Sequence, residues 1–265
     1  MAVGGEPTTM RQDARPNCGE SDSVIWDAQR LRDPHGQPDK AARVRAMFDS
    51  IAPTYERVNR VLSAGRDAYW RRTAVNMAGI TPGDRVLDIA CGTGDFARAF
   101  RAAGPAGVVG TDFAGGMLGL AARRDPAAIR WCQADAQRLP FRDGSFTVTS
   151  CAFGVRNFQD LPRGLGEMRR VLGPGGRAVI LEFAVPRTPV LGRLYQFYLR
   201  RVLPRAAAWI SGDRSGAYDY LPSSVSSFIQ TADMIDLLRR VGFARMTHRP
   251  LTLGAVVVYV AWRDA

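Results

Sequence analysis

The sequence is poor in several residue types that build common functional sites. Only two histidines are present, His35 and His248, which is too few for a histidine-based metal centre. The cysteines show no C-x-x-C spacing, so neither a zinc site nor a redox pair is predicted, and we interpret them as free thiols. They are Cys18, Cys91, Cys132 and Cys151. No metal ligand set is expected.

Lysine is almost absent as well. Of the 36 basic residues, Lys40 is the only lysine. The formal net charge is +11, but no run of five or six basic residues forms a patch, and the arginine bias is typical of genome composition. Nucleic acid is therefore not a predicted partner. A weak attraction to anionic lipid is compatible with this charge.

Long apolar runs are also missing. No stretch reaches the roughly 18 apolar residues that span a bilayer, and the first 25 residues contain no hydrophobic signal-peptide core. We therefore expect a cytoplasmic protein. A hydrophobic content of 46% is ordinary for a globular chain of this length and is sufficient for a buried core.

The composition changes along the chain and predicts its organisation. Residues 1–40 are rich in Gly, Pro, Asp and Gln, which predicts a disordered tail. Residues 41–265 are expected to form a single domain, in which 41–80 make an N-terminal helical cap. Residues 187–227 interrupt the domain with a helical insertion. This insertion is either a helix packed on the sheet or a lid over an apolar substrate.

Strand and helix patterns alternate between residues 81 and 265. This alternation predicts an α/β fold, with a mostly parallel sheet, helices on both faces, and an antiparallel pair at the end. The expected strands are residues 85–90, 107–113, 129–136, 146–155, 177–186, 244–252 and 254–263. The expected helices between and after them are residues 95–104, 114–124, 161–176 and 231–243.

A glycine turn follows the first strand. Gly92, Thr93 and Gly94 begin a G-x-G-x-x-A pattern that by itself would also suit a dinucleotide dehydrogenase. Asp88 lies four residues before this turn, where it can fix the turn or reach a ligand's ammonium through water. A pyrophosphate would be repelled by this carboxylate, whereas S-adenosylmethionine (SAM) carries no phosphate and is cationic.

Two more carboxylates end the next two strands. Asp112 can accept both ribose hydroxyls of a nucleoside, and Asp135 can accept the exocyclic amine of adenine. Each acid alone is explained by a turn or a helix cap. Three acids at the carboxyl ends of successive strands favour an adenosyl ligand in the crevice that such sheets form there.

Longer segments resemble a known family. They are "FDSIAPTYERVNRVLSAGRDAYWRR", "VLDIACGTGDFA", "GTDFAGGML", "ADAQRLPFRDGSFTVTSCAFGVRNF", "MRRVLGPGGRAVILEF" and "AYDYLPSSV". The chain resembles the Rossmann-like class I methyltransferases, and most closely the branch that methylates demethylmenaquinone and the ubiquinone precursor. The resemblance implies a seven-stranded sheet whose last strand is antiparallel, and SAM as cofactor. It implies cofactor contacts in and after the strand ends, at Gly92, Thr93, Gly94, Asp112, Phe113, Asp135 and Ala136.

The resemblance also implies a reaction, the conversion of demethylmenaquinol to menaquinol by transfer of a methyl group to a ring carbon. Methylation of the methoxybenzoquinol precursor of ubiquinone is a second reaction of the branch. Arg156 is expected to stabilise the developing phenolate, and Asn157 to orient a water or the ring oxygen. Tyr55 and Tyr220 are candidate substrate contacts, although each is also explained as a packing tyrosine.

Several alternatives remain at this point. The domain could methylate another phenolic or polyketide metabolite, or bind the cofactor as an assembly subunit without turnover. A nucleic-acid methyltransferase lacks its N-P-P-Y or Pro-Cys motif here, and a dehydrogenase would bind NAD. A prenylated quinol would bring the protein to the inner face of a membrane as a peripheral contact, through the helix of residues 191–203. Pairing into a homodimer is compatible with the resemblance.

Overall fold

The computed structural model describes residues 25–186, 188–211 and 217–264. Seven strands form one sheet in the order β3-β2-β1-β4-β5-β7-β6. The strands are β1 (Arg85–Ile89), β2 (Gly107–Asp112), β3 (Arg130–Gln133), β4 (Phe146–Ala152), β5 (Leu172–Phe183), β6 (Arg245–Leu251) and β7 (Val256–Trp262). All pairings from β3 to β5 are parallel, and β7 runs antiparallel to both of its neighbours. The predicted mostly parallel sheet is confirmed.

The central strands are apolar because both faces of the sheet are covered. In β7, the sequence VVVYVAW has six buried residues in a row, which β-branched side chains suit well. Helices α3 (Arg66–Ala78) and α4 (Asp95–Ala102) cover one face. Helices α6 (Leu161–Arg170) and α10 (Thr231–Val241) cover the other. Helix α5 (Gly115–Arg124) packs beside β2 and β3.

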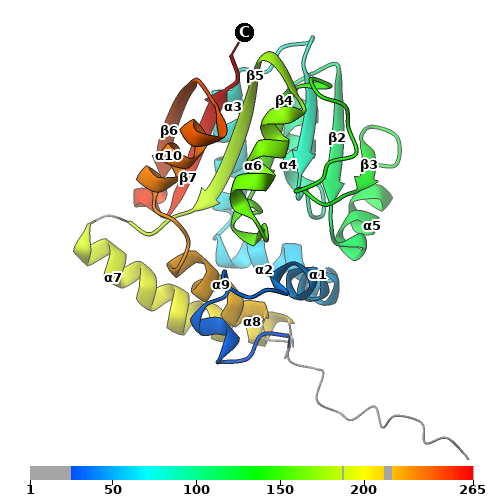
Figure 1. Cartoon of the computed structure of the whole chain (residues 1–265). Helices are drawn as coiled ribbons and strands as arrows, with labels where there is room; N and C mark the ends of the chain where they lie inside the picture. The colour runs from blue at the N-terminus through cyan, green and yellow to red at the C-terminus, as the bar shows by residue number, and fades with distance from the viewer. Residues whose placement is uncertain (1–24, 187, 212–216, 265) are drawn as a thin grey trace, which may run out of the picture.

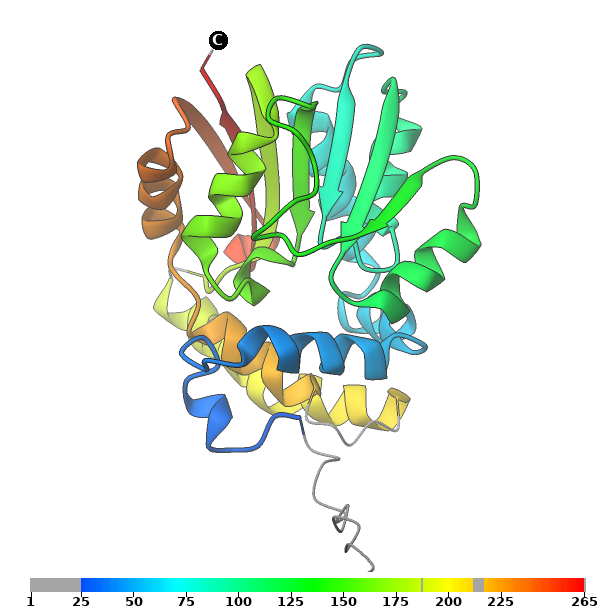
Figure 2. The same ribbon diagram turned by 45° about the vertical axis from the view of Figure 1, so that its right-hand side comes forward.

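A separate layer of helices lies across the carboxyl ends of the strands (Figures 1 and 2). It combines the N-terminal helices with the insertion, so segments far apart in sequence lie side by side. Its members are α1 (Lys40–Ile51), α2 (Tyr55–Leu62), α7 (Pro189–Phe197), the π-helical turn Tyr198–Val202, α8 (Leu203–Ser211) and α9 (Ala217–Ser226). This layer closes the edge of the sheet at which the predicted ligand contacts gather.

The structure corrects two expectations. Residues 25–40 are packed, and the Trp26 side chain is only 2% exposed, because its ring lies in a core formed with α1 and α9. The rest of the expected tail, residues 1–24, lies outside the described residues. The helix expected over 161–176 ends at Arg170, and β5 begins at Leu172 because this residue pairs with Phe146 of β4.

Candidate active site

A cavity of about 90 Å³ lies where β1, β2 and β4 end. Its walls come from the strand ends and the loops that follow them, and α1 covers it through Val44, Arg45 and Phe48. Most of the residues predicted to contact the cofactor line it, together with one of the two predicted catalytic residues. They are Gly92, Asp112, Phe113, Asp135, Ala136 and Asn157.

Asp112 is the best-defined group in this cavity. Its Oδ2 accepts a hydrogen bond from the Gly92 amide at 2.7 Å, and its Oδ1 accepts one from the Ala114 amide at 2.8 Å. Each oxygen keeps a second lone pair for a ligand. Burial raises the pKa of Asp112 to about 6, while the backbone N–H donors partly oppose this shift. At neutral pH the carboxylate is therefore an anchored acceptor.

Backbone strain is concentrated around the same cavity. Ala90 and Phe153 follow β1 and β4 and hold positive φ angles of 52° and 56°, which L-residues rarely adopt. Gly92 has φ 56°, and apart from its own chain neighbours no atom of the described residues lies within 4 Å of where its Cβ would be. The backbone thus leaves space beside Gly92 that a side chain would occupy. Such strain gathers where a site is shaped for a ligand.

Three of the predicted cofactor residues do not line this cavity. Asp88, Thr93 and Gly94 are buried beside it, and their contact with a cofactor stays a prediction. Asp88 is fully buried, accepts a hydrogen bond from Ser150 Oγ at 2.7 Å, and has its pKa raised to about 7 by burial. Gly94 is required for packing, since a Cβ there would come within 2.6 Å of the Trp131 ring.

Asp135 lies two residues beyond the end of β3. Its Oδ1 accepts hydrogen bonds from the backbone amide of Gln137 at 2.9 Å and from the Gln137 side chain at 3.3 Å. These bonds fix the carboxylate at the cavity rim. Together, Asp112 and Asp135 make this cavity suitable for the hydroxyls and amine of an adenosyl group, and unfavourable for a pyrophosphate.

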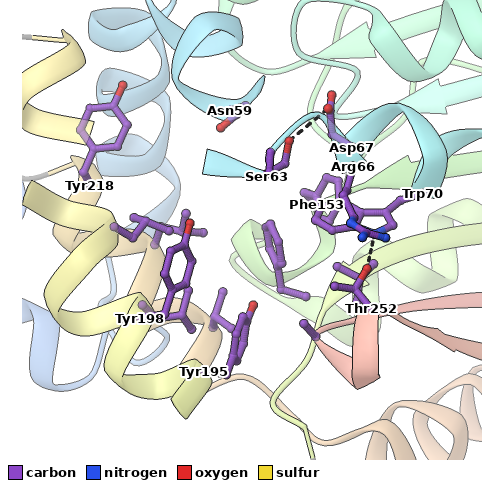
Figure 3. Close-up of a pocket in the computed structure, with 18 of the residues that line it drawn as sticks. Asn59, Ser63, Arg66, Asp67, Trp70, Phe153, Tyr195, Tyr198, Tyr218 and Thr252 are labelled. Atoms are coloured by element: carbon purple, nitrogen blue, oxygen red, sulfur yellow. Dashed lines mark hydrogen bonds between the residues drawn. The ribbon is translucent and has the colours of Figure 1, made fainter. Parts of the chain in front are cut away.

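A second and larger cavity of about 440 Å³ adjoins the first (Figure 3). Phe48, Tyr55 and Phe153 line both cavities, so these three side chains form the partition between them. The remaining walls are mostly aromatic and aliphatic. In Figure 3, Tyr195 and Tyr198 of the insertion face Trp70 and Phe153 across this space. Its size and lining suit a large apolar ligand.

Arg156 lines the larger cavity and is only 6% exposed. Its Nη1 donates to Glu182 Oε1 at 2.9 Å and to the carbonyl of Phe153, and its backbone amide donates to Glu182 Oε2. The Nε–H is buried without a hydrogen-bond partner among the described residues. The arginine is therefore held at the wall of the larger cavity by a buried carboxylate.

The two predicted tyrosines have different environments. Tyr220 is buried, stacks on Trp26 with ring centroids 4.4 Å apart, and donates its hydroxyl hydrogen to Asn157 Oδ1 at 2.9 Å. Burial raises its pKa. Tyr55 lies in the partition and packs edge-on against Phe48. The structure thus brings Arg156, Asn157, Tyr55 and Tyr220 together around the partition.

Sequence reasoning missed Glu182, Lys40 and Phe153. Glu182 was visible as a single acid inside the apolar strand of residues 177–186. Lys40 is buried and donates from Nζ to the Phe158 carbonyl at 2.6 Å, beside the loop that carries Arg156. Phe153 could not be recognised from the sequence, because its place beside the cavity depends on a positive backbone φ angle. No group of three or more potential metal ligands occurs among the described residues.

Comparison with known proteins agrees with this geometry. The sequence profile of the ubiE/COQ5 methyltransferase family matches residues 37–263. A demethylmenaquinone methyltransferase of Deinococcus radiodurans is 46% identical over 84% of this chain and 93% of its own. A ubiquinone/menaquinone biosynthesis C-methyltransferase of Geobacter sulfurreducens is 44% identical over 83% of this chain and 88% of its own.

Solved structures show the same fold at lower identity. A SAM-dependent methyltransferase of Thermotoga maritima superposes with a TM-score of 0.59 at 21% identity, covering 83% of this chain and 99% of the other. The architecture is therefore that of a class I methyltransferase domain.

Proposed function

Because the chain belongs to the ubiE/COQ5 methyltransferase family, and is thus a SAM-dependent methyltransferase, we propose that it methylates a ring carbon of a prenylated hydroquinone, converting demethylmenaquinol to menaquinol. One observation carries the proposal. A small cavity with fixed carboxylates meets a large apolar cavity at a partition of Phe48, Tyr55 and Phe153. A methyl donor on one side can face a ring on the other.

The smaller cavity fits the cofactor. Asp112 would accept the ribose hydroxyls, Asp135 the adenine amine, and the open space beside Gly92 would admit the chain of the donor. Bound SAM supplies a methyl group on a sulfonium, so that a carbon–carbon bond forms at the ring as the carbon–sulfur bond breaks. The described residues around the cavity need only align the two partners and exclude water.

The larger cavity fits the substrate. Its aromatic walls can hold a quinol ring and the first units of a prenyl tail. A hydroquinone hydroxyl has a pKa of about 10, so it is not ionised at neutral pH. The Arg156 guanidinium would favour loss of the hydroxyl proton to water and stabilise the phenolate that pushes electron density onto the ring carbon. After methylation, that carbon would lose its ring hydrogen to water as a proton and the ring oxygen would regain one, which restores the aromatic quinol. Asn157, held by Tyr220, would position that water or oxygen.

The direct test is transfer of label. Purified protein is incubated with methyl-labelled SAM and reduced demethylmenaquinone of short tail length. Label on the ring carbon of menaquinol supports the proposal. Cofactor binding without label would reject this substrate.

Arg156 provides a sharper test of the mechanism. A single change to alanine would strand the buried Glu182 charge and risk unfolding, so we choose Arg156→Gln combined with Glu182→Gln. We expect turnover to fall by about 100-fold or more, with SAM affinity within about threefold of the parent, because Arg156 does not line the cofactor cavity. Arg177→Gln combined with Asp84→Asn, which removes a second, largely buried ion pair away from both cavities, is the control. Unchanged turnover of the Arg156 and Glu182 variant would rule out the role of Arg156.

A second head group deserves the same assay, since the Geobacter sulfurreducens relative is named for both ubiquinone and menaquinone biosynthesis. The methoxybenzoquinol precursor of ubiquinone, offered in competition with demethylmenaquinol, measures the preference. A prenylated substrate resides in lipid, so peripheral contact with the inner face of the membrane is part of the proposal. No described helix is long and apolar enough to cross a bilayer.

A further inference from the structure

Exposed hydrophobic side chains are concentrated around one part of the surface. Nine large hydrophobic residues are exposed in the described part of the chain, and eight of them belong to three segments that line the larger cavity. Those eight are Val61 and Tyr69 of α2 and α3, Val190, Leu194, Phe197, Val202 and Trp209 of the insertion, and Leu253 of the turn between β6 and β7. Single exposed apolar residues are ordinary, but a gathering of this kind marks an interaction surface.

The mouth of the cavity lies among these residues. Leu194 and Leu253 line the cavity, yet they are 63% and 76% exposed. Ala64, in the turn between α2 and α3, and Arg66, the first residue of α3, also line it and are exposed. Side chains that face both the cavity and solvent define its rim. The rim is therefore formed by Ala64, Arg66, Leu194, Thr252 and Leu253, of which the two leucines are the large apolar side chains.

Leu253 is held outward by a strained turn. Thr252 and Leu253 both have positive φ angles, 47° and 56°, and Gly254 follows with 90°. Trp70 Nε1 donates to Thr252 Oγ1 at 2.8 Å and anchors this turn to the cavity wall (Figure 3). Exposing a leucine on a strained turn has a cost in stability. Such a cost is consistent with a surface that becomes covered in use.

Charge complements the apolar residues. Between Thr188 and Ser211 there are four arginines and no acidic residue. The arginines are Arg193, Arg200, Arg201 and Arg205. Val190, Leu194 and Phe197 follow i, i+4, i+7 spacing and so share one face of α7. An exposed apolar helix face flanked by cations matches the interface of an anionic bilayer.

We infer that the rim of the larger cavity is a docking face for an anionic lipid bilayer, and that the substrate's prenyl tail passes between Leu194 and Leu253 from the lipid into the cavity. The inference rests on the proposed prenylated substrate. The docking face is defined as the exposed residues named above in α2, α3, α7, the π-helical turn Tyr198–Val202, α8 and the β6–β7 turn. Its occupant is a bilayer, because the surface combines exposed apolar side chains with positive charge.

Vesicle binding tests the docking face. The purified protein is sedimented with vesicles of phosphatidylcholine alone, or of phosphatidylcholine mixed with phosphatidylglycerol. We expect binding to the mixed vesicles that weakens as salt increases. Phe197→Gln combined with Trp209→Gln should lower the partition coefficient by about tenfold or more. Neither residue lines a cavity. Arg200→Gln combined with Arg201→Gln should remove most of the preference for anionic lipid.

Matched controls lie outside the face. Ile229→Gln changes the one exposed large hydrophobic residue in the described part of the chain that does not belong to the face. Arg239→Gln combined with Arg240→Gln removes two arginines from α10. Neither control should change vesicle binding. Equal losses in controls and test variants, or no binding by the parent, would overturn the inference. A second copy of the chain would be the occupant of the face if two results came together. The parent would be a dimer that does not bind vesicles, and the Phe197 and Trp209 variant would be a monomer.

Turnover separates this inference from the proposed function. The Phe197 and Trp209 variant should methylate a water-soluble, short-tail quinol at the parental rate, but a long-tail quinol in vesicles at least about fivefold more slowly. Parental protein that binds vesicles but methylates neither quinol would contradict the proposed function and leave the docking face standing. Equal rates of variant and parent on both substrates would contradict the route through the rim.

Discussion

Burial sets the charge state of the acids that end the first two strands. The carboxyl groups of Asp88 and Asp112 are removed from water, which raises their pKa to about 7 and about 6. Only Asp112 lines a cavity, and its two oxygens are oriented by the amides of Gly92 and Ala114. Protonation of Asp112 is therefore expected to change the affinity for a cofactor.

We predict that Asp112→Asn weakens SAM binding about tenfold to a hundredfold, as for loss of a hydrogen bond to a charged group. In the parent, affinity should also fall as the pH drops through about 6, because protonation removes the negative charge and turns one acceptor oxygen into a donor. The variant should lack this pH dependence. Calorimetric titration with SAM measures both. Asp143→Asn, at an exposed site, is the control. If Asp112→Asn and the parent had the same pH profile of SAM affinity, Asp112 would not be the titrating group.

Lys40 also has a strongly shifted pKa. Burial lowers its pKa from 10.5 to about 8, and the nearby Arg156 acts in the same direction. The unfolded chain therefore binds more protons than the folded one between these two values. It follows that this lysine makes the folded state more stable as the pH rises from about 8 towards 10.

We predict that Lys40→Met removes this rise. Between pH about 7 and pH about 10, the free energy of unfolding of the parent should rise relative to that of the variant by on the order of 2 kcal/mol. Urea unfolding at both pH values measures it, and groups common to the two proteins cancel in the difference. Parallel pH profiles would show that Lys40 keeps an ordinary pKa.

At the scale of elements, the N-terminal segment supports the loop that carries Arg156 and Asn157. Lys40 Nζ donates to the Phe158 carbonyl, the Ala41 amide donates to Gln159 Oε1, and Gln159 Nε2 donates to the Gln37 carbonyl. Trp26 adds a second support, because it stacks on the tyrosine that holds Asn157. The segment before α1 is therefore part of the site's framework.

Two tryptophans allow a matched test of this framework. Trp26→Ala should lower the free energy of unfolding by about 3–5 kcal/mol, as for a large core residue. Trp209→Ala should change it by less than about 0.5 kcal/mol, because Trp209 is 89% exposed. Urea denaturation compares them. A small effect at Trp26 would mean that the N-terminal segment is not coupled to the core.

At the scale of the whole molecule, the cofactor cavity lies between two bodies of structure. One wall comes from the carboxyl ends of β1, β2 and β4, and the strand order reverses between β1 and β4. The other wall comes from α1. A third core of buried residues joins α1, α2 and α9 of the helical layer to Ala114 and Met117 at the start of α5, apart from the two cores on the faces of the sheet. A ligand in the cavity therefore bridges the layer and the sheet.

We predict that SAM at about 100 times its Kd stabilises the whole chain by about 2.7 kcal/mol, visible as a higher melting temperature. NAD at the same concentration should have no effect, since its pyrophosphate would approach the carboxylates of Asp112 and Asp135. Thermal unfolding with each ligand measures this, and Asp112→Asn should need more SAM for the same shift. Equal stabilisation by NAD would revive the dehydrogenase interpretation.

The sequence by itself determined the parallel sheet, the antiparallel last strand and the positions of the acids at the strand ends. These features follow from local periodicity and from the chain order of strands and helices, which short segments carry. Asp112 and Asp135 could be placed at the site because the carboxyl ends of parallel strands meet at one edge. Family motifs added Arg156 and Asn157.

Only the tertiary structure decided which side chains meet. It buried Trp26 against Tyr220, paired Arg156 with Glu182, and joined two cavities at Phe48, Tyr55 and Phe153. It also buried Asp88 completely and left Val190, Leu194 and Phe197 exposed on one face of α7. The physical reason is that burial and pairing depend on residues far apart in sequence, whose approach is set by packing of whole elements and not by local pattern.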